Sequence, residues 1–311
     1  MFTETDYELH WPKIINIIDS YTKNESALKN IVQYQFKNPG KGFRSILSIH
    51  ICEELGVSLY KIYPLCAAIE LIHNASLVHD DIEDHDEYRR DDLAVWKKFG
   101  ISNAINLGDY LFATAFEILS QKSPELIEIL SLSIKSLVEG QIMEINSNSF
   151  KLEDYLEIAR KKSGALLTLP ILGAYRLKGN AIDMKTLISF GYNLGEIYQL
   201  RDDIIDMMGQ KEGRPKYSDI KEGRFSILNI ITYDDIEDKN SFSAMLLSGD
   251  NKDKLLELYK KNSTLEKAYN LYHKKILELK GRKIYSEIKP VIDAFLEKLS
   301  LPLMNDKYYG I

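Results

Sequence analysis

The acidic sequence DDIED occurs at residues 80–84 and again at 234–238, and a near copy, DDIID, occupies 202–206. On an α-helix, residues four apart share a face, so each copy would present a pair of carboxylates together. Carboxylate oxygens suit Mg²⁺, which takes one or two of them and leaves its other positions to water and substrate phosphates. Acidic runs are also common on solvated helix faces, so the neighbouring residues must distinguish a site from a surface.

Cationic side chains follow two of the three copies. Arg89 and Arg90 come shortly after the first copy, and a polar loop with Arg214 and Arg224 follows the near copy. Arginine binds phosphate oxygens through paired hydrogen bonds, so acids for a metal beside arginines for phosphate predict a diphosphate–metal site. The copy at 234–238 has no such arginine pair. We predict that it is an inert part of the surface.

The elements that carry these residues are predicted to be helices. Between 63 and 85, apolar residues recur at steps of three and four, with Pro64 in the first helical turn. The same periodicity predicts helices over 103–121, 125–147, 151–177, 183–208, 252–281 and 283–300. No alternating strand pattern is found. The predicted loops are 37–42, 86–92, 209–222 and 233–251.

Both candidate acidic groups lie at the C-terminal ends of predicted helices. The helix dipole is negative at that end and disfavours carboxylates, so a positive group must compensate them. Solvent or lysines would compensate in part, and bound divalent cations would do so better. The helix face that carries Asp80 runs back to His73, and the face that carries Asp202 runs back to Gln199.

The composition is that of an ordinary globular chain. The 311 residues are 45% hydrophobic and 28% charged, with a net charge of −6 that argues against nucleic-acid binding. Cys52 and Cys66 form no metal or disulfide pattern, as expected in a reducing cytosol. No signal peptide is recognised, and no apolar run approaches the roughly 20 residues of a membrane span. We predict one all-α domain, 1–311, in the cytoplasm, without a transmembrane segment.

These motifs together resemble the trans-isoprenyl diphosphate synthases, the polyprenyl synthetase family, and most closely its geranylgeranyl diphosphate synthases. The resemblance covers nearly the whole chain in the family's order. It implies an isoprenoid-synthase-type bundle of long, mostly antiparallel helices around a central cavity. The matching motifs are PGKGFRS (39–45), LIHNASLVHDDIEDHDEYRR (71–90), GDYLFA (108–113), EGQ (139–141), KKSG (161–164), YQLRDDIID (198–206) and GRPKYSDIKEGRFS (213–226).

The resemblance implies a prenyltransferase and a homodimer. Dimethylallyl, geranyl or farnesyl diphosphate would ionise, isopentenyl diphosphate would attack the carbocation, and a proton would be lost. Three Mg²⁺ would neutralise the departing diphosphate. The implied metal-binding residues are Asp80, Asp81, Asp84, Asp202, Asp203 and Asp206, some of them acting through water.

The resemblance also assigns substrate contacts. Arg89, Lys162, Arg214 and Arg224 would contact the allylic diphosphate. Lys41, Arg44, His73 and Arg90 would bind isopentenyl diphosphate, and Tyr198 would pack near its isopentenyl group. Ser163 and Gln199 would direct oxygen dipoles at the carbocation. The predicted catalytic residues are Asp80, Asp84, Asp202, Lys162, Ser163, Gln199 and Arg224.

Several of these assignments have structural alternatives, and the chain departs from the family in places. His73 or Tyr198 would also suit a core, Gln199 a bond between helices, and Lys162 a solvated surface. Gly42 stands where many members have arginine, and Arg214 and Arg224 stand where lysines are usual. Those two keep the charge but change its geometry. Trp96 occupies a position where histidine is common.

Product length is predicted from the turn before the first acidic group. Ala75 and Ser76 are small, whereas bulky aromatics there stop growth at fifteen carbons in this family. Phe112 from a facing helix, with Leu71 and Ile72, is the predicted chain-length barrier. We predict a twenty-carbon product, with twenty-five carbons or more, or fifteen, as alternatives.

Three other classes of protein share some of these features. A non-catalytic partner subunit would have a damaged acidic motif, and a terpene cyclase would lack the second motif and the GKxxR sequence. A di-iron bundle would need Glu-x-x-His pairs on facing helices, and the chain has only one such spacing, Glu70 with His73.

Overall fold

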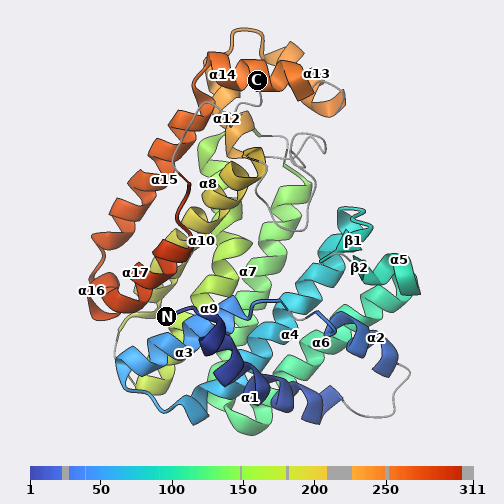
Figure 1. Cartoon of the computed structure of the whole chain (residues 1–311), viewed down its shortest axis with the longest axis vertical. Coiled ribbons are helices and arrows are strands. Elements are labelled where there is room, and N and C mark those ends of the chain that lie inside the picture. The colour runs from blue at the N-terminus through green and yellow to red at the C-terminus, as the bar shows by residue number, and fades with distance from the viewer. Residues whose placement is uncertain are drawn as a thin grey trace. The chain divides into compact units, whose positions relative to one another are not determined.

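The structure is a computed structural model that describes residues 1–22, 28–38, 40–90, 92–147, 149–179, 182–208, 226–248 and 252–302. These residues are almost entirely helical, as Figure 1 shows, and the all-α prediction is confirmed. They form two compact units, and the single-domain prediction stays a prediction. The first unit comprises 1–135, 166–188 and 287–298, and the second comprises 136–165, 189–286 and 299–311.

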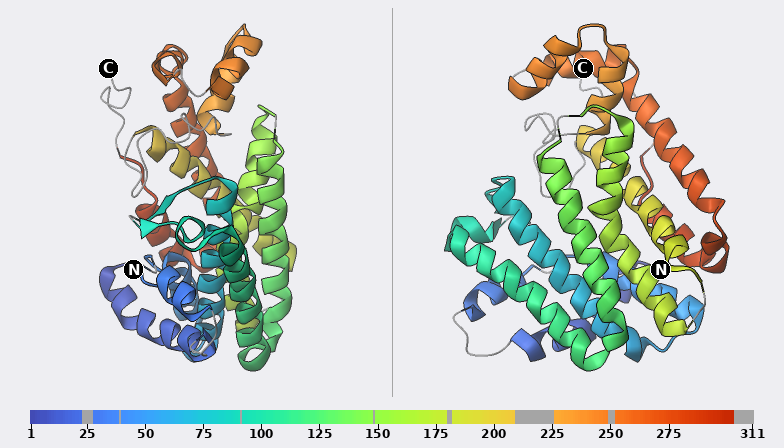
Figure 2. Two further views of the ribbon diagram at one scale, coloured as in Figure 1. Left: turned by 90° about the vertical axis from the view of Figure 1, so that its right-hand side faces the viewer. Right: turned by 180° about the vertical axis from the view of Figure 1, so that it is seen from behind.

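The first unit is built around α4 (Leu59–Glu83), which packs against α3 (Phe43–Leu55) and α6 (Ile101–Lys122). Figure 2 shows α4 and α6 side by side along much of their length. Most of α4 is buried, which explains its nearly continuous apolar sequence. The other helices that lie wholly in this unit are α1 (Glu4–Thr22), α2 (Lys29–Gln35), α5 (Val95–Phe99), η1 (Pro124–Leu126) and α17 (Lys289–Lys298).

The second unit gathers helices around α12 (Ile227–Asp235), which packs against α8 (Leu152–Lys161), α14 (Lys252–Lys261) and α15 (Thr264–Lys280). It also contains α13 (Lys239–Ser248) and most of α16 (Lys283–Glu287). Four helices contribute residues to both units, namely α7 (Ile127–Ile145), α9 (Ser163–Lys178), α10 (Met184–Met207) and α16, whose Glu287 belongs to the first unit.

The long helices lie where periodicity predicted them, but three are interrupted. The segment predicted as 151–177 breaks at Lys162 into α8 and α9, and the segment predicted as 252–281 breaks before α15. The segment predicted as 283–300 breaks at Ile288 into α16 and α17. Ser263 has a positive φ of 52° at the second break. Periodicity continues across these breaks, so a pattern of apolar steps does not reveal them.

The prediction of a loop over 233–251 was wrong, because α12 ends only at Asp235 and α13 follows. The Asp238 carboxylate caps α13 by accepting from the backbone N–H of Ser241 at 3.0 Å and from its hydroxyl at 2.7 Å. Phe242 is buried against Tyr233, which gives the short helix a core contact. Helices of this length present too few turns for periodicity to identify.

Two smaller expectations also need correction. Pro64 is the sixth residue of α4 rather than part of its first turn, because the helix begins at Leu59. Burial of the surrounding apolar residues offsets the hydrogen bond that proline removes. Within 86–92, β1 (Tyr88–Arg89) and β2 (Asp92–Leu93) pair as a short antiparallel hairpin, which is too brief to show an alternating pattern.

Candidate active site

The first acidic group forms the C-terminal end of α4. Asp80 is half-buried in the last turn and Asp84 is the C-cap, so both follow His73 along one face. Asp81 lies on another side of the helix and is only 3% exposed. The three carboxylates are therefore divided between an accessible pair and one buried group.

Asp81 holds the hairpin that follows the helix. Nε of Arg89 donates to the Asp81 carboxylate at 2.7 Å, and a second guanidinium nitrogen contacts the same oxygen. The Asp86 carboxylate also accepts from Arg89, at 3.1 Å. Burial lowers the pKa of Arg89, but the neighbouring Asp81 charge outweighs burial and the pKa is raised. Trp96, at the position where histidine is common in the resembling family, donates from Nε1 to the Asp86 carbonyl at 2.7 Å and braces the same turn.

Three arginines gather around His73. Arg44 donates to Nε2 of His73 at 3.4 Å, so that nitrogen is an acceptor and the ring is neutral. Burial, together with the charges of Arg44, Arg90 and Arg89, holds the pKa of His73 well below 6.5. A neutral imidazole beside guanidinium groups suits an anion that needs both charge and a hydrogen bond.

Glu70 supports this cationic group and was missed by sequence reasoning. It is 2% exposed, and the Ser45 hydroxyl donates to its carboxylate at 2.6 Å. Burial raises the pKa of Glu70, although Ser45, Arg44 and Arg90 oppose that rise. Its only sequence signal is its place one turn before His73, which is an ordinary spacing in any helix.

The loop before α3 carries Lys41, whose side chain is exposed. Arg90 donates to the backbone carbonyl of Asn38 and ties this loop to the hairpin. Gly42, where arginine is common in the resembling family, has a φ of +56°, and a Cβ there would lie 3.2 Å from the Tyr7 ring. Tyr7 stacks on Trp11 with ring centroids 5.1 Å apart. Tyr7 and Trp11 of α1 therefore cover the position where the arginine side chain of members of that family would begin.

The second acidic group lies at the end of α10. Asp202 is half-buried, whereas Asp203 and Asp206 are 3% and 2% exposed. Asp203 accepts from the Tyr155 hydroxyl, the Gln199 amide and the Ile227 backbone N–H, each at 2.9 Å. It thereby joins α8, α10 and the start of α12.

Lys162 and Ser163 lie at the break between α8 and α9. The ammonium of Lys162 pairs with the carboxylate of Glu144 on α7. A Cβ at Gly140 would lie 2.6 Å from the Lys162 backbone nitrogen, so glycine is required for this approach of α7. Ser163 donates to the Gln199 carbonyl oxygen at 2.9 Å. Sequence reasoning missed Glu144, because only the fold brings it to Lys162.

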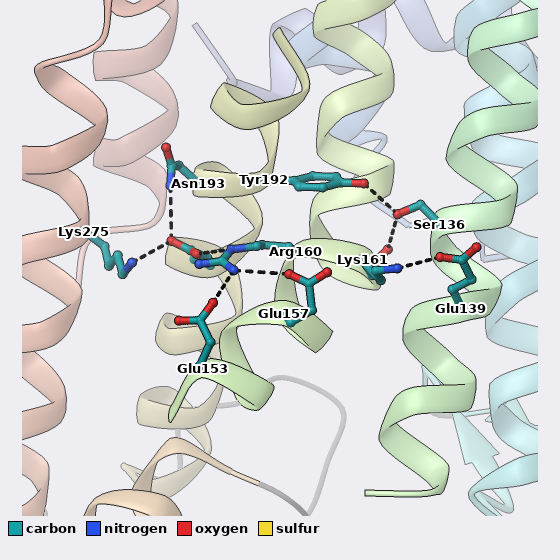
Figure 3. Close-up of polar contacts among 10 residues, drawn as sticks. Ser136, Glu139, Glu153, Glu157, Arg160, Lys161, Tyr192, Asn193 and Lys275 are labelled. Carbon is teal, nitrogen blue, oxygen red and sulfur yellow. Dashed lines mark hydrogen bonds and ion pairs between the residues drawn. The ribbon is translucent and has the colours of Figure 1, made fainter. Parts of the chain in front are cut away.

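An ion-pair network links α8, α10 and α15 (Figure 3). The Glu196 carboxylate is 0% exposed and pairs with Arg160 of α8 at 2.6 Å and Lys275 of α15 at 3.0 Å. Arg160 also binds Glu153 at 2.7 Å. On the α7 side, Lys161 pairs with Glu139 at 2.6 Å. Half-buried Tyr198 lies between Glu196 and Gln199 on α10.

Comparison with known proteins decides the family. The family model of the polyprenyl synthetases matches residues 25–264. The chain belongs to the polyprenyl synthetase family. It is an enzyme of that family, a trans-prenyltransferase that condenses isopentenyl diphosphate with an allylic diphosphate.

Named relatives of this polyprenyl synthetase differ in product. A short chain isoprenyl diphosphate synthase of Methanocaldococcus jannaschii is 34% identical over 70% of each chain. A geranylgeranyl diphosphate synthase of Saccharolobus solfataricus is 32% identical over 86% of this chain and 88% of its own. Other matches are named for C15 and C50 products.

A solved structure shares the fold. A polyprenyl synthase from Caulobacter crescentus, crystallised with calcium and isoprenyl diphosphate, superposes with a TM-score of 0.78. It is 22% identical, and the match covers 98% of this chain and 92% of that one. Likeness at this identity concerns the fold alone.

The acidic groups of this polyprenyl synthetase suit a hard divalent cation, the kind of metal that its family uses with diphosphates. The candidate ligands in each group are carboxylate oxygens. Among the residues that the structure describes, no cluster of three or more His, Cys, Asp or Glu side chains could hold a metal ion. A metal bound here would therefore depend on water and diphosphate oxygens for its other ligands, as Mg²⁺ commonly does.

The predicted chain-length residues lie along α4 and α6. Ala75 and Ser76 are buried one turn before Asp80, and Leu71 and Ile72 are fully buried beyond them. The Phe112 ring is 5.9 Å from the His79 ring, so it lies level with the turn nearest the acids. The role of Phe112 as a chain-length barrier stays a prediction, and this contact places its ring beside α4.

The remaining predictions concern the third acidic copy and the loop after α10. The carboxylates of 234–238 are exposed, as predicted, and Asp235 pairs with Lys267 at 2.7 Å. Arg214 and Arg224 lie outside the described residues. Among the described helices, none combines the length and apolarity that crossing a bilayer requires.

Proposed function

We propose that this prenyltransferase makes the twenty-carbon product geranylgeranyl diphosphate. The observation that carries the proposal is the pair of small residues, Ala75 and Ser76, in the buried turn before Asp80. Small side chains there leave room for a chain longer than fifteen carbons, and Phe112 beside His79 narrows the path. The named C20 relative supports the same length.

Product analysis tests this proposal. The purified enzyme is incubated with Mg²⁺, isopentenyl diphosphate and each of the three allylic starters in turn. We expect geranylgeraniol after dephosphorylation and chromatography, with every starter that is used. A principal product of fifteen carbons, or of twenty-five or more, would replace the proposed length with one of its alternatives.

We propose that Asp80 and Asp84 hold Mg²⁺ on the first unit and Asp202 holds it on the second. Their partial exposure supports this role, whereas Asp81, Asp203 and Asp206 are buried. The metal, proposed as three Mg²⁺ per site, would neutralise charge as the diphosphate departs. The calcium and isoprenyl diphosphate bound by the Caulobacter crescentus enzyme support a divalent metal.

The cationic residues are proposed to divide into two groups, each of which binds one of the two diphosphate substrates. Arg89 and Lys162 would bind the allylic diphosphate, together with Arg214 and Arg224. Isopentenyl diphosphate would bind to Lys41, Arg44, His73 and Arg90, and Tyr198 would pack beside its isopentenyl group. The three guanidinium groups that depress the pKa of His73 support an anion site in the first unit. Arg44→Ala should therefore raise the KM for isopentenyl diphosphate, and Lys162→Ala the KM for the allylic substrate.

A homodimer is proposed from exposed apolar residues of α6. Ile101 and Ile105 are 50% and 45% exposed and lie one turn apart on the same face. Sedimentation should give a dimer for the native chain and a monomer for Ile105→Glu. Leu9→Glu on α1, where the native leucine is also exposed, is the control and should remain dimeric. Cytoplasmic location stays a prediction.

A further inference from the structure

Tyr155 is a buried residue of α8 with no part in the roles assigned above. Its side chain is 2% exposed, and its hydroxyl donates to an Asp203 oxygen at 2.9 Å. The same oxygen accepts the backbone N–H of Ile227, at the start of α12, also at 2.9 Å. Two donors from separate helices therefore hold one side of this carboxylate.

The other Asp203 oxygen determines how the Gln199 amide is turned. A carboxylate receiving these bonds acts as an acceptor, so it must face the NH₂ end of the amide, at 2.9 Å. The carbonyl end of Gln199 then faces Ser163, whose hydroxyl donates to it at 2.9 Å. Gly164 and Gly195 allow this contact, since a Cβ at Gly195 would overlap the Gly164 backbone.

We propose that Tyr155 and Asp203 are positioning residues that fix the orientation of the Gln199 amide. The inference rests on the proposed role of Gln199, which is to direct an oxygen at the allylic carbocation. A reversed amide would direct N–H groups at that positive charge and would oppose ionisation. Asp203 thus acts through Gln199 rather than as the metal ligand that the family resemblance implied.

Tyr155→Phe tests the proposal because it removes one hydroxyl and keeps the ring. We expect kcat to fall about tenfold with both KM values unchanged, since the lost bond acts on the transition state alone. Tyr175→Phe is the matched control. Tyr175 is 1% exposed and donates to the Glu287 carboxylate at 3.0 Å, and both residues belong to the other compact unit. Its loss should lower stability without changing kcat.

A double-mutant cycle separates positioning from general structural support. In a Gln199→Ala background there is no amide to orient, so Tyr155→Phe should change kcat by less than about twofold. Equal losses in both backgrounds would overturn the proposal, because they would mean that Tyr155 does not act through Gln199.

A measurement without turnover tests the role of Asp203 itself. Asp203→Asn should lower the melting temperature measured in EDTA. In a titration with Mg²⁺ in the presence of inorganic diphosphate, the Mg²⁺ concentration at half of the full rise in melting temperature should stay unchanged. Asp202→Asn should show the reverse. If Asp203→Asn instead raises the Mg²⁺ concentration needed for stabilisation and leaves the metal-free melting temperature unchanged, Asp203 is a metal ligand. The proposed positioning of Gln199 by Tyr155 and Asp203 is then wrong. Product length does not enter this measurement, so it can fail independently of the proposed function.

Discussion

Single residues with the same local sequence have different surroundings in this enzyme. Asp80 lies in the last turn of a long buried helix that is followed by Arg89 and Arg90, whereas Asp234 is exposed near the end of α12. Both begin a DDIED sequence. The difference lies in their neighbours, and it should appear in turnover.

Asp80→Ala should lower kcat by about a thousandfold, because it removes a ligand for the cation that stabilises the developing diphosphate charge. Asp234→Ala should leave kcat within about threefold, as expected for an exposed surface residue. Steady-state kinetics with saturating substrates would measure both. Comparable losses in the two variants would contradict the assignment of the first copy as the site.

His73 should make stability depend on pH. Folding holds the pKa of His73 well below 6.5. As the pH falls below 6.5, His73 is therefore protonated in the unfolded chain before it is protonated in the folded chain. The stability contributed by neutral His73 is complete above pH 6.5 and is lost as the pH falls further. The melting temperature should therefore fall more steeply on acidification for the native chain than for His73→Gln. Replacement of exposed His273 by Gln is the control and should keep the native slope.

At the scale of elements, close helix contacts hold the proposed substrate residues. Gly140 lets α7 approach the break that carries Lys162, and Glu144 on the same helix pairs with that lysine. In the first unit, Arg89 reaches back from the hairpin to Asp81. Each cation is therefore held by a carboxylate from a neighbouring element before any diphosphate arrives.

Gly140→Ala should move α7 away from Lys162, since the added Cβ would lie 2.6 Å from a backbone nitrogen. We expect a stability loss of about 1–3 kcal/mol, as for overpacking, with a raised KM for the allylic substrate. Gly281→Ala is the control, because its Cβ would meet nothing nearer than 3.5 Å. Denaturant unfolding and kinetics would measure both effects. An unchanged KM would separate this contact from substrate binding.

Product length should respond to the volume between α4 and α6. Ala75→Phe or Ser76→Phe should shift the product toward fifteen carbons by filling space in the turn before Asp80. Phe112→Ala should lengthen it by widening the path beside His79. Chromatography of the dephosphorylated products would report both. Native product length in both kinds of variant would show that the chain grows along another path.

At the scale of the whole molecule, the two acidic groups belong to different compact units. Asp80 and Asp84 lie in the first, and Asp202 lies in the second. The Glu196 network joins α8, α10 and α15 within the second unit, so each group has its own supporting contacts. Binding a diphosphate with its metal at either acidic group should therefore stabilise the unit that carries that group.

Metal removal tests this expectation. EDTA should abolish turnover, and Mg²⁺ with inorganic diphosphate should raise the melting temperature of the native chain. At a ligand concentration of 100 Kd, the gain would be about 2.7 kcal/mol. Asp80→Ala should lose most of this gain while keeping its metal-free melting temperature. Full turnover in EDTA would show that no exchangeable metal takes part.

The sequence by itself determined the features that depend on local spacing. The i, i+4 period places Asp80 with Asp84 and predicts the long helices, and arginines near two copies distinguish them from the third. These features depend on spacing along the chain, so they can be recognised without knowledge of the tertiary structure. They also carried the family resemblance, which the comparisons confirmed.

Only the tertiary structure decided which acids turn inward and what they hold. Asp81 and Asp203 are the second residues of their motifs, yet one holds Arg89 and the other holds Tyr155 and Gln199. Spacing along one helix says nothing about donors from residues far away in the chain. Glu70 and Glu144 were missed, and α13 was taken for a loop, for the same physical reason. Burial and hydrogen bonding are set by segments that meet only when the chain is folded.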